Sequence, residues 1–310
     1  MSTPSSASPL PPIASFTVGL KRSGTSLLRS LLDGHPELWV LPRESKTFHW
    51  VDSKHPLETF LSSTRYPEVF PDDTPERKRF EAELGPRLKN AGDVPAAILA
   101  VAESVAAVNP PPASARLWME KTPDHLLDVP DLLRRFGRDT RIVCTIRDPR
   151  AQIASRARRR QPGEHFPIPR FCRKWALADD LMRRFAVECP GFLLVRYEDI
   201  VLQTESTVRR VTDHLGIEWT DELLSPTRDG GEWKGNSSYG HTVSGINSAS
   251  LERYKEQLEA KQIEDIERLL GPRMLERGYE PTTSDWNGGK AKRWLMELRT
   301  RADLRKTARQ

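Results

Sequence analysis

A glycine-rich turn between a strand pattern and a helix pattern restricts the fold of this chain more than any other feature. Residues 13–20, IASFTVGL, are a β-branched and aromatic run with a glycine near its end, which predicts a buried strand. After the turn, the leucines of residues 27–32 occur at i, i+1, i+4 and i+5 and share one face of a predicted helix. A strand, a glycine turn and a helix in this order form the context in which backbone N–H groups bind phosphate groups.

The turn is nearly a nucleotide phosphate loop, but its cations stand in different places. Such a loop reads G-x-x-x-x-G-K-[ST], with the lysine directly after the second glycine. Here Thr25 follows Gly24, and Lys21 and Arg22 stand earlier, inside the turn. The helix N-terminus favours an anion in either case, and Thr25 and Ser26 add hydroxyl donors. We therefore predict a phosphate or sulfate site at this turn; a glycine turn without a ligand is the alternative.

Strand patterns alternate with helix patterns after this turn. Further strands are predicted at residues 38–41, 116–120, 141–147 and 192–197. Helices are predicted at residues 96–108, 126–136, 149–160, 170–188 and 204–216. This alternation predicts a P-loop-containing α/β fold with three layers, α/β/α, and a central parallel sheet covered by helices on both faces.

The remaining segments are expected to extend one large domain. Residues 1–12 are rich in Ser and Pro and are expected to be a disordered tail. Residues 13–287 are expected to form the main domain, in which residues 50–115 are a helical insertion that serves as a lid or a wall of the binding site. Residues 251–279 are predicted to be helical. Residues 288–310 follow a Gly-Gly break, contain eight Lys or Arg residues and are predicted to form a basic helix or tail.

Composition narrows the class of protein. The 310 residues, with 37% hydrophobic and 29% charged, suit one large or two small α/β domains. A net charge of +5 suits an anionic ligand or surface, but the Lys and Arg residues are spread along the chain and do not indicate nucleic-acid binding. The three cysteines form no C-x-x-C pair, so we expect no zinc site and no disulfide framework. With no signal-peptide pattern and no membrane-spanning apolar stretch, a cytoplasmic protein is expected.

The residues in and after the turn resemble a known family. GLKRSGTSLLRSLLDGHPELWVLPRES is similar to the 5′-phosphosulfate loop of sulfotransferases that use 3′-phosphoadenosine 5′-phosphosulfate (PAPS), in the branch related to tyrosylprotein, bacterial and carbohydrate sulfotransferases. In that branch the loop reads roughly P-R-S-G-T-T-L-L-R, followed by L-L-D-x-H-P and then by a Glu before a small hydroxyl residue. Lys21 replaces the proline. The donor-binding residues that the resemblance implies here are Lys21, Arg22, Ser23, Gly24, Thr25 and Ser26.

Later segments extend the resemblance. RIVCTIRDPRAQIASR resembles the family's 3′-phosphate-binding block, which implies that Arg147 and Ser155 hold that phosphate. MEKTPDH resembles a segment that ends in Lys-x-Pro and implies that Lys121 lies beside the sulfuryl group. WKGNSS with GINSASLERYKEQL resembles the late loop over the adenosine diphosphate, where Ser250 is the expected contact. VRYED matches another strand-end segment, in which Tyr197 is either a packing residue or a contact.

The resemblance implies an in-line transfer of a sulfuryl group from PAPS to a hydroxyl group, without a metal ion. Arg22 or Lys21 would neutralise the charge that develops on the oxygen between phosphate and SO₃. Glu44 matches the family's proposed base by position, and His49 is the alternative base. The acceptor is a sugar, a lipid, a peptide tyrosine or a small molecule, and the residues leave this choice open.

Two other functions stay open on the sequence alone. A P-loop kinase would need a lysine after Gly24 and a metal-holding acidic residue at a strand end; the first is absent and no clear second is present. The second alternative is a non-catalytic protein that binds a nucleotide or a membrane surface. In residues 288–310, Trp294, Leu295 and Leu298 lie near one face among basic residues. This pattern suits either contact with anionic lipid or packing on the domain.

Overall fold

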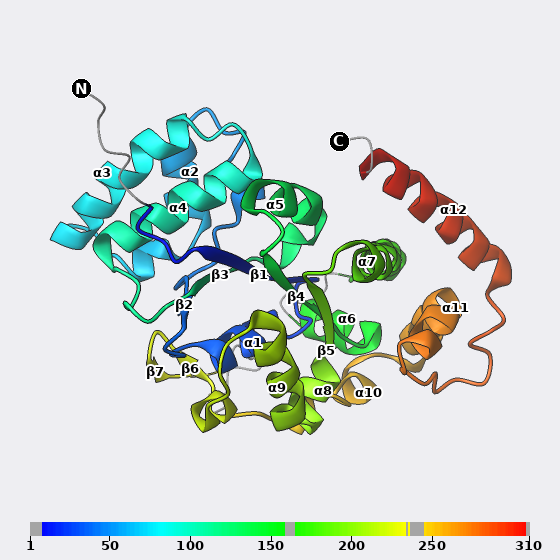
Figure 1. The fold of residues 1–310 in the computed structure, drawn as a ribbon. Helices are drawn as coiled ribbons and strands as arrows, with labels where there is room; N and C mark the ends of the chain where they lie inside the picture. The colour runs from blue at the N-terminus through cyan, green and yellow to red at the C-terminus, as the bar shows by residue number, and fades with distance from the viewer. Residues whose placement is uncertain (1–7, 159–164, 234, 236–244, 308–310) are drawn as a thin grey trace.

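A parallel sheet of five strands forms the centre of the molecule (Figure 1). The computed structural model describes residues 8–158, 165–233, 235 and 245–307, and all four strand pairings of this sheet are parallel. In spatial order the strands are β2 (Leu38–Val40), β3 (Leu117–Lys121), β1 (Ile13–Gly19), β4 (Arg141–Ile146) and β5 (Phe192–Arg196). The predicted α/β fold with a central parallel sheet is confirmed.

Helices cover both faces of this sheet and complete the three layers (Figure 1). One face carries α1 (Thr25–Leu32), α8 (Tyr197–Leu202) and α9 (Thr204–Leu215). The opposite face carries α4 (Val94–Val108), α5 (Val129–Phe136) and α7 (Ile168–Glu188). Successive residues of β4 alternate between these cores, because Val143 joins the first whereas Ile142 and Cys144 join the second.

Three helices occupy residues 50–115, the predicted helical insertion. They are α2 (Pro56–Ser63), α3 (Pro75–Lys89) and α4, which α3 contacts along its length. Aromatic rings of Phe60, Tyr66 and Phe80, with centroids 5.1 to 6.2 Å apart, form the core between the elements.

Several element boundaries differ from the expectation by a few residues, two of them through a change of element. The strand predicted at 192–197 ends at Arg196, because Tyr197 begins α8. The helix predicted at 126–136 is divided into a 3₁₀ segment, Pro123–Asp128, and α5. The first difference places the Tyr197 side chain at the end of the sheet instead of within it.

Residues near the N-terminus contact the domain. Of residues 1–12, which we expected to be a disordered tail, the structure describes 8–12. There Leu10 packs on the core and Pro11 is buried. The chain is therefore attached to the core before β1 begins.

The C-terminal elements pack on α7 and on α6 (Pro149–Ala157). They are α10 (Tyr254–Gln257), α11 (Ala260–Glu276) and α12 (Lys290–Thr307). Within α12, Met296 and Thr300 are buried against the domain. No helix in the described ranges is both long and apolar enough to cross a membrane.

A buried carboxylate, that of Glu120 in β3, holds the segment after β2 against the sheet. Its Oε1 accepts hydrogen bonds from the N–H of Ser45 at 3.0 Å and from the Ser45 hydroxyl at 2.9 Å. Its Oε2 lies 3.0 Å from Nδ1 of His125, whose Nε2 lies 2.8 Å from the hydroxyl of Thr47. The side chains of Glu120 and His125 have 0% exposed surface, so water does not compete for these bonds.

The two charged partners shift one another's pKa. Burial alone would raise the pKa of Glu120, but His125 and the other hydrogen-bond donors lower it; burial alone would lower the pKa of His125, but Glu120 raises it. The histidine contribution to stability is complete below its ordinary value of 6.5 and is lost as the pH rises through the folded pKa. The glutamate contribution is complete above its ordinary value of 4.5 and is lost as the pH falls through the folded pKa. The pair therefore stabilises the fold most between these two values.

We expect the substitution His125→Gln to lower the free energy of unfolding most between pH 4.5 and pH 6.5. The substitution leaves the Glu120 carboxylate buried without a counter-charge, which costs about 3 to 5 kcal/mol. Denaturant unfolding of the wild type and the variant from about pH 4 to about pH 9 measures the difference. His55→Gln, at an exposed position, is the control. A difference that does not change with pH would exclude the ion pair as its source.

Candidate active site

A cavity of about 380 Å³ lies at the carboxyl end of the sheet, where parallel α/β folds bind ligands. Nine of the residues predicted for the site line it: Lys21, Arg22, Gly24, Thr25, Ser26, Glu44, Arg147, Ser155 and Ser250. Two others do not, because Ser23 is buried in the turn and Lys121 lines an adjoining pocket. Residues that are far apart in the sequence therefore line one cavity.

The turn between β1 and α1 presents the N-terminus of α1 to the cavity. Gly24, the residue before the helix, has a φ of +103°, and no side chain caps the helix. A Cβ atom at Gly24 would lie 2.4 Å from Cδ2 of Tyr197, so only glycine fits here. The first N–H groups of α1 lack a capping side chain and, with the helix dipole, favour a bound anion.

Two side chains of this turn are held in place. The hydroxyl of Ser23 lies 2.7 Å from that of Thr145, and the Ser23 N–H donates to the carbonyl of Leu20 at 3.0 Å. Ser23 therefore supports the turn from behind. Arg22 has a φ of +76°, which non-glycine residues rarely adopt, and its Nε donates to Oγ of Ser155 at 2.8 Å. Arg22 is thereby held across the cavity, toward α6.

Lys21 lies along a different wall. Its ammonium is 2.8 Å from Oδ2 of Asp124 and 5.2 Å from the ring centroid of Phe48. Nearby, burial lowers the pKa of His49, and the positive charges of Lys21 and Lys46 lower it further. The imidazole of His49 is therefore neutral at neutral pH and could accept a proton.

Arg147 follows β4 and forms the wall on that side. Its Nη1 donates to the carbonyl of Arg22 at 3.2 Å, and its Nη2 donates to the carbonyl of Ser250 at 2.7 Å. The guanidinium carbon lies 4.2 Å from the ring centroid of Tyr197. The Nε of Arg147 is buried and has no hydrogen-bond partner among the described residues. A buried donor of this kind is costly, so this is the point at which the site would gain most from an anion.

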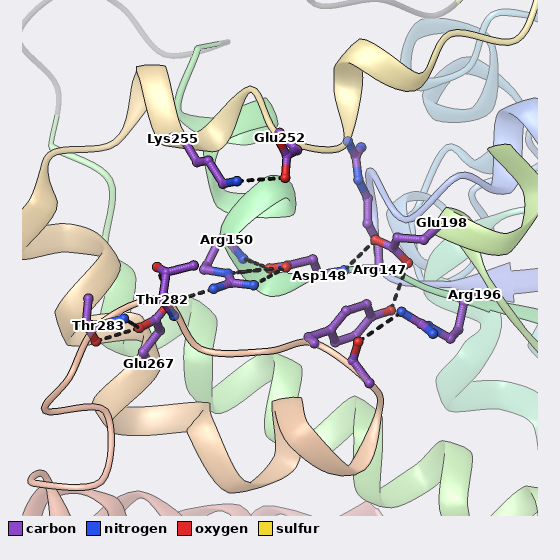
Figure 2. A network of polar contacts seen from close by, with 12 residues as sticks. Arg147, Asp148, Arg150, Arg196, Glu198, Glu252, Lys255, Glu267, Thr282 and Thr283 are labelled. Atoms are coloured by element: carbon purple, nitrogen blue, oxygen red, sulfur yellow. Dashed lines mark hydrogen bonds and ion pairs between the residues drawn. The ribbon is translucent and has the colours of Figure 1, made fainter. Parts of the chain in front are cut away.

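Buried charged residues follow Arg147 in the chain and form a network of ion pairs (Figure 2). Arg150 forms ion pairs with Asp148 at 2.6 Å and with Glu267 of α11 at 2.5 Å. Backbone and hydroxyl groups of residues 282–283 also donate to Glu267. The C-terminal segment is thus connected by ion pairs to the residues that follow β4.

A second part of this network involves Glu198 (Figure 2). Its carboxylate accepts hydrogen bonds from the N–H of Asp148 at 3.1 Å and from the hydroxyl of Tyr279 at 3.0 Å. Burial raises the pKa of Glu198. Tyr197 precedes Glu198 in the chain; its ring lies against the Arg147 guanidinium, and its hydroxyl lies 2.7 Å from Oγ of Ser250.

Glu44 and Lys121 form an ion pair on the β3 side of the cavity. Nζ of Lys121 also donates to Oγ of Ser26 at 3.3 Å. The side chains of Lys121 and Glu44 are 11% and 26% exposed; Glu44 lines the cavity, and both residues line the adjoining pocket. Their chain neighbours Glu120 and Ser45 are hydrogen-bonded to one another, which sets the separation of the pair. In the described part of the chain, no group of three or more metal-ligating side chains is arranged to hold a metal ion.

Unusual backbone conformations gather around this site. Of the four non-glycine residues with positive φ in the described ranges, Arg22 and Lys46 line the cavity, and Asp229 pairs with Arg43 beside it. Such conformations cost about 1 to 3 kcal/mol each and cluster at functional sites. Their positions agree with a site at this edge of the sheet.

Several residues that line the cavity were not assigned to the site from the sequence. The sequence left Tyr197 as either a packing residue or a contact, and it is both, because it fills the space beside Gly24 and lines the cavity. Lys46, Asn247 and Arg253 also line the cavity. They lie in or near loops, where spacing gives no signal, whereas Tyr197 could be found from its place at a strand end. Residues 234 and 236–244, part of the expected late loop, lie outside the described residues.

The chain is similar to known sulfotransferase sequences. A sequence model of the sulfotransferase family matches residues 14–221. The chain is 26% identical over 286 residues to "Protein-tyrosine sulfotransferase 2" of Gallus gallus, an alignment that covers 88% of this chain and 71% of the relative. It is 23% identical over 303 residues to "Protein-tyrosine sulfotransferase" of Drosophila melanogaster, where 91% of this chain and 54% of the relative are covered.

Solved structures show the same fold. The sulfotransferase domain from the curacin biosynthetic pathway aligns with a TM-score of 0.50 and 18% identity, and the alignment covers 87% of this chain and 99% of that domain. The family match at residues 14–221 includes the turn, the segment that carries Glu44, and strands β1 to β5. On this match over more than half of its length, the chain belongs to the sulfotransferase family.

Proposed function

We propose that this chain transfers a sulfuryl group from PAPS to a hydroxyl group of an acceptor. The observation that carries the proposal is that the cavity lies next to the ion pair of Glu44 and Lys121, so that two kinds of site adjoin one another. On the β4 side are the N-terminus of α1 and Arg147, which suit phosphate groups. On the β3 side are Glu44 and Lys121, which suit proton and charge transfer.

The residues of the cavity fit a donor with phosphate groups at two ends. The turn at Lys21–Ser26 would hold the 5′ end through its backbone and hydroxyl groups. Arg147 and Ser155 would hold the 3′-phosphate, since the Nε of Arg147 is a buried donor without a partner in the described part of the chain. Ser250, beside Tyr197, would contact the adenosine side. When bound, PAPS would supply the sulfuryl group that the reaction transfers.

The cations of the site would stabilise negative charge at the reacting end. Lys121 is held by Glu44 and Ser26, and Arg22 is held by Ser155, so both are oriented before any ligand binds. Charge that is fixed in advance costs no reorganisation during the reaction. We therefore propose that side chains supply the positive charge and that no metal ion is required.

Glu44 is our proposed general base. Its carboxylate is partly exposed to the cavity beside Lys121, where an acceptor hydroxyl would approach. His49 is the alternative because its imidazole is neutral and lines the same cavity. The acceptor class, whether a sugar, a lipid, a peptide tyrosine or a small alcohol or phenol, stays a question for a screen with labelled donor.

We expect Glu44→Gln to reduce sulfuryl transfer at least about 100-fold, which is typical of the loss of a general base. The affinity for 3′-phosphoadenosine 5′-phosphate (PAP) should stay within about twofold, because Glu44 does not lie in the phosphate-binding part. Transfer from labelled PAPS and calorimetry with PAP measure the two effects. Glu58→Gln, at an exposed position of α2, is the matched control. Full activity of the Glu44 variant would assign the role to another group, with His49→Gln tested next.

We expect Arg147→Gln to weaken PAP binding about 10- to 100-fold, the effect of losing a charge-assisted contact with phosphate. Adenosine 5′-phosphate, which lacks the 3′-phosphate, should bind the variant and the wild type equally well. Arg184→Gln, on the exposed side of α7, controls for the loss of one positive charge. Calorimetry with both nucleotides tests this. Tight binding of ATP with magnesium and no binding of PAP would reject the proposed donor.

We also propose that α12 brings the protein into peripheral contact with anionic membranes. The side chains of Trp294, Leu295 and Leu298 are 62%, 51% and 43% exposed. Lys290, Arg293 and Arg301 line the same surface hollow as Trp294 and Leu298. A helix with an apolar face among basic residues binds the interface of an anionic bilayer.

The double substitution Trp294→Ser with Leu298→Ser should abolish sedimentation with vesicles of phosphatidylserine and phosphatidylcholine. The wild type should sediment with these vesicles and not with pure phosphatidylcholine, because both apolar burial and charge contribute. Leu202→Ser, which changes an exposed leucine on α8, is the control. Equal sedimentation of the double variant and the wild type would exclude α12 as the contact.

A further inference from the structure

A second pocket of about 250 Å³ adjoins the cavity beyond Glu44. The two spaces share Ser26, Glu44 and Lys46, so the ion pair of Glu44 with Lys121 stands between them. The lining of this second pocket is basic. Its cations are Arg29, Arg43, Lys46, Arg65, Lys121 and Arg228.

Four of these six cations are neutralised by neighbouring carboxylates. Arg29 contacts Asp33 at 3.5 Å and Asp229 at 3.0 Å, and Arg43 contacts Asp229 at 2.8 Å. Arg65 contacts Glu68 at 2.5 Å, and Lys121 is paired with Glu44. The neighbouring carboxylates therefore leave two of the six positive charges in the pocket without an ion pair.

The two remaining cations are Lys46 and Arg228. Lys46 donates to the carbonyl of Ser63 at 3.1 Å, an uncharged partner. The guanidinium of Arg228 forms no ion pair or hydrogen bond with any residue in the described ranges, although it is half-buried. Burial lowers the pKa of Arg228, and the nearby Arg43 and Arg65 lower it further. An oxyanion in the pocket would relieve this repulsion and give Arg228 a partner.

The backbone that carries Arg228 is held in place. It ends β6 (Thr227–Arg228), which pairs with β7 (Gly231–Glu232) in a two-residue hairpin. Oδ2 of Asp33, at the end of α1, accepts hydrogen bonds from the Thr227 hydroxyl at 3.0 Å and from the Gly230 N–H at 3.1 Å. The hairpin is thus attached to α1, and Arg228 needs little reordering to bind a ligand.

We propose that this pocket is a subsite for a carboxylate or phosphate group of the acceptor, with Arg228 as its main ligand. The inference rests on the proposed function, since the acceptor hydroxyl would lie at Glu44 and the rest of the molecule would extend into the pocket. The enzyme then selects hydroxyl compounds that carry a compact oxyanion over their uncharged analogues. Arg228 acts in specificity and takes no part in the transfer step.

Binding to protein saturated with PAP tests this subsite, because PAP fills the donor part and its own binding is measured first. The probes are 4-hydroxyphenylacetate and its uncharged amide, with inorganic phosphate to distinguish a phosphate site from a carboxylate site. We expect the acid to bind the wild type at least about tenfold more tightly than the amide, as one charge-assisted contact allows. In Arg228→Gln the preference should disappear, and in Arg228→Lys part of it should remain, because the charge is kept and the planar fork is lost.

Arg184→Gln, far from the pocket on α7, should keep the full preference and is the matched control. Three results would overturn the proposal: equal binding of the acid and the amide to the wild type, anion binding that Arg228→Gln leaves unchanged, or no binding of either anion to PAP-saturated protein. In contrast, a failure of PAP itself to bind would reject the proposed donor. The two proposals are therefore tested separately.

Discussion

The buried Glu120 carboxylate is the contact on which the arrangement of the active site depends. It accepts hydrogen bonds from Ser45 and pairs with His125, with no exposed surface on either charged side chain. Ser45 follows Glu44, and Lys121 follows Glu120, so this one group fixes the separation of the proposed base and its cation. The buried Glu120–His125 ion pair thus stabilises the positions of Glu44 and Lys121. On its own, this partly exposed second pair would have a less defined geometry, because exposed ion pairs contribute little free energy.

Glu44 divides the cleft into two spaces with different electrostatic character. On one side, the helix N-terminus and Arg147 provide donors for phosphate groups, and the buried Nε of Arg147 lacks a partner among the described residues. On the other side, Arg228 and Lys46 leave an excess of positive charge. A donor on the first side and an acceptor on the second would meet at Glu44 and Lys121, which is the order that a direct transfer between two bound molecules requires.

The sequence was sufficient for the fold and for nine of the residues that line the first cavity. Strands and the turn at Lys21–Ser26 are local patterns of hydrophobic period and glycine, and they were found within a residue of their ends. The second pocket was not predicted, because its contacts are not local: Asp229 lies 200 residues after Arg29. Glu120 and His125 stood in the quoted segment MEKTPDH, but the contact of Glu120 with Ser45 depends on the segment after β2 lying beside β3, which no spacing reveals.

The ion pair between Arg150 and Glu267 has a consequence for how the domain can be divided. Arg150 and Asp148 lie just after Arg147, which follows β4, whereas Glu267 and the groups that donate to it belong to α11 and the residues beyond (Figure 2). A version of the protein that ends before α11 would lack Glu267. The buried Arg150 guanidinium would then keep only Asp148 as a counter-charge. The family model ends at residue 221, yet the buried charge that pairs with Arg150 lies at residue 267, and the groups that donate to it extend to residue 283.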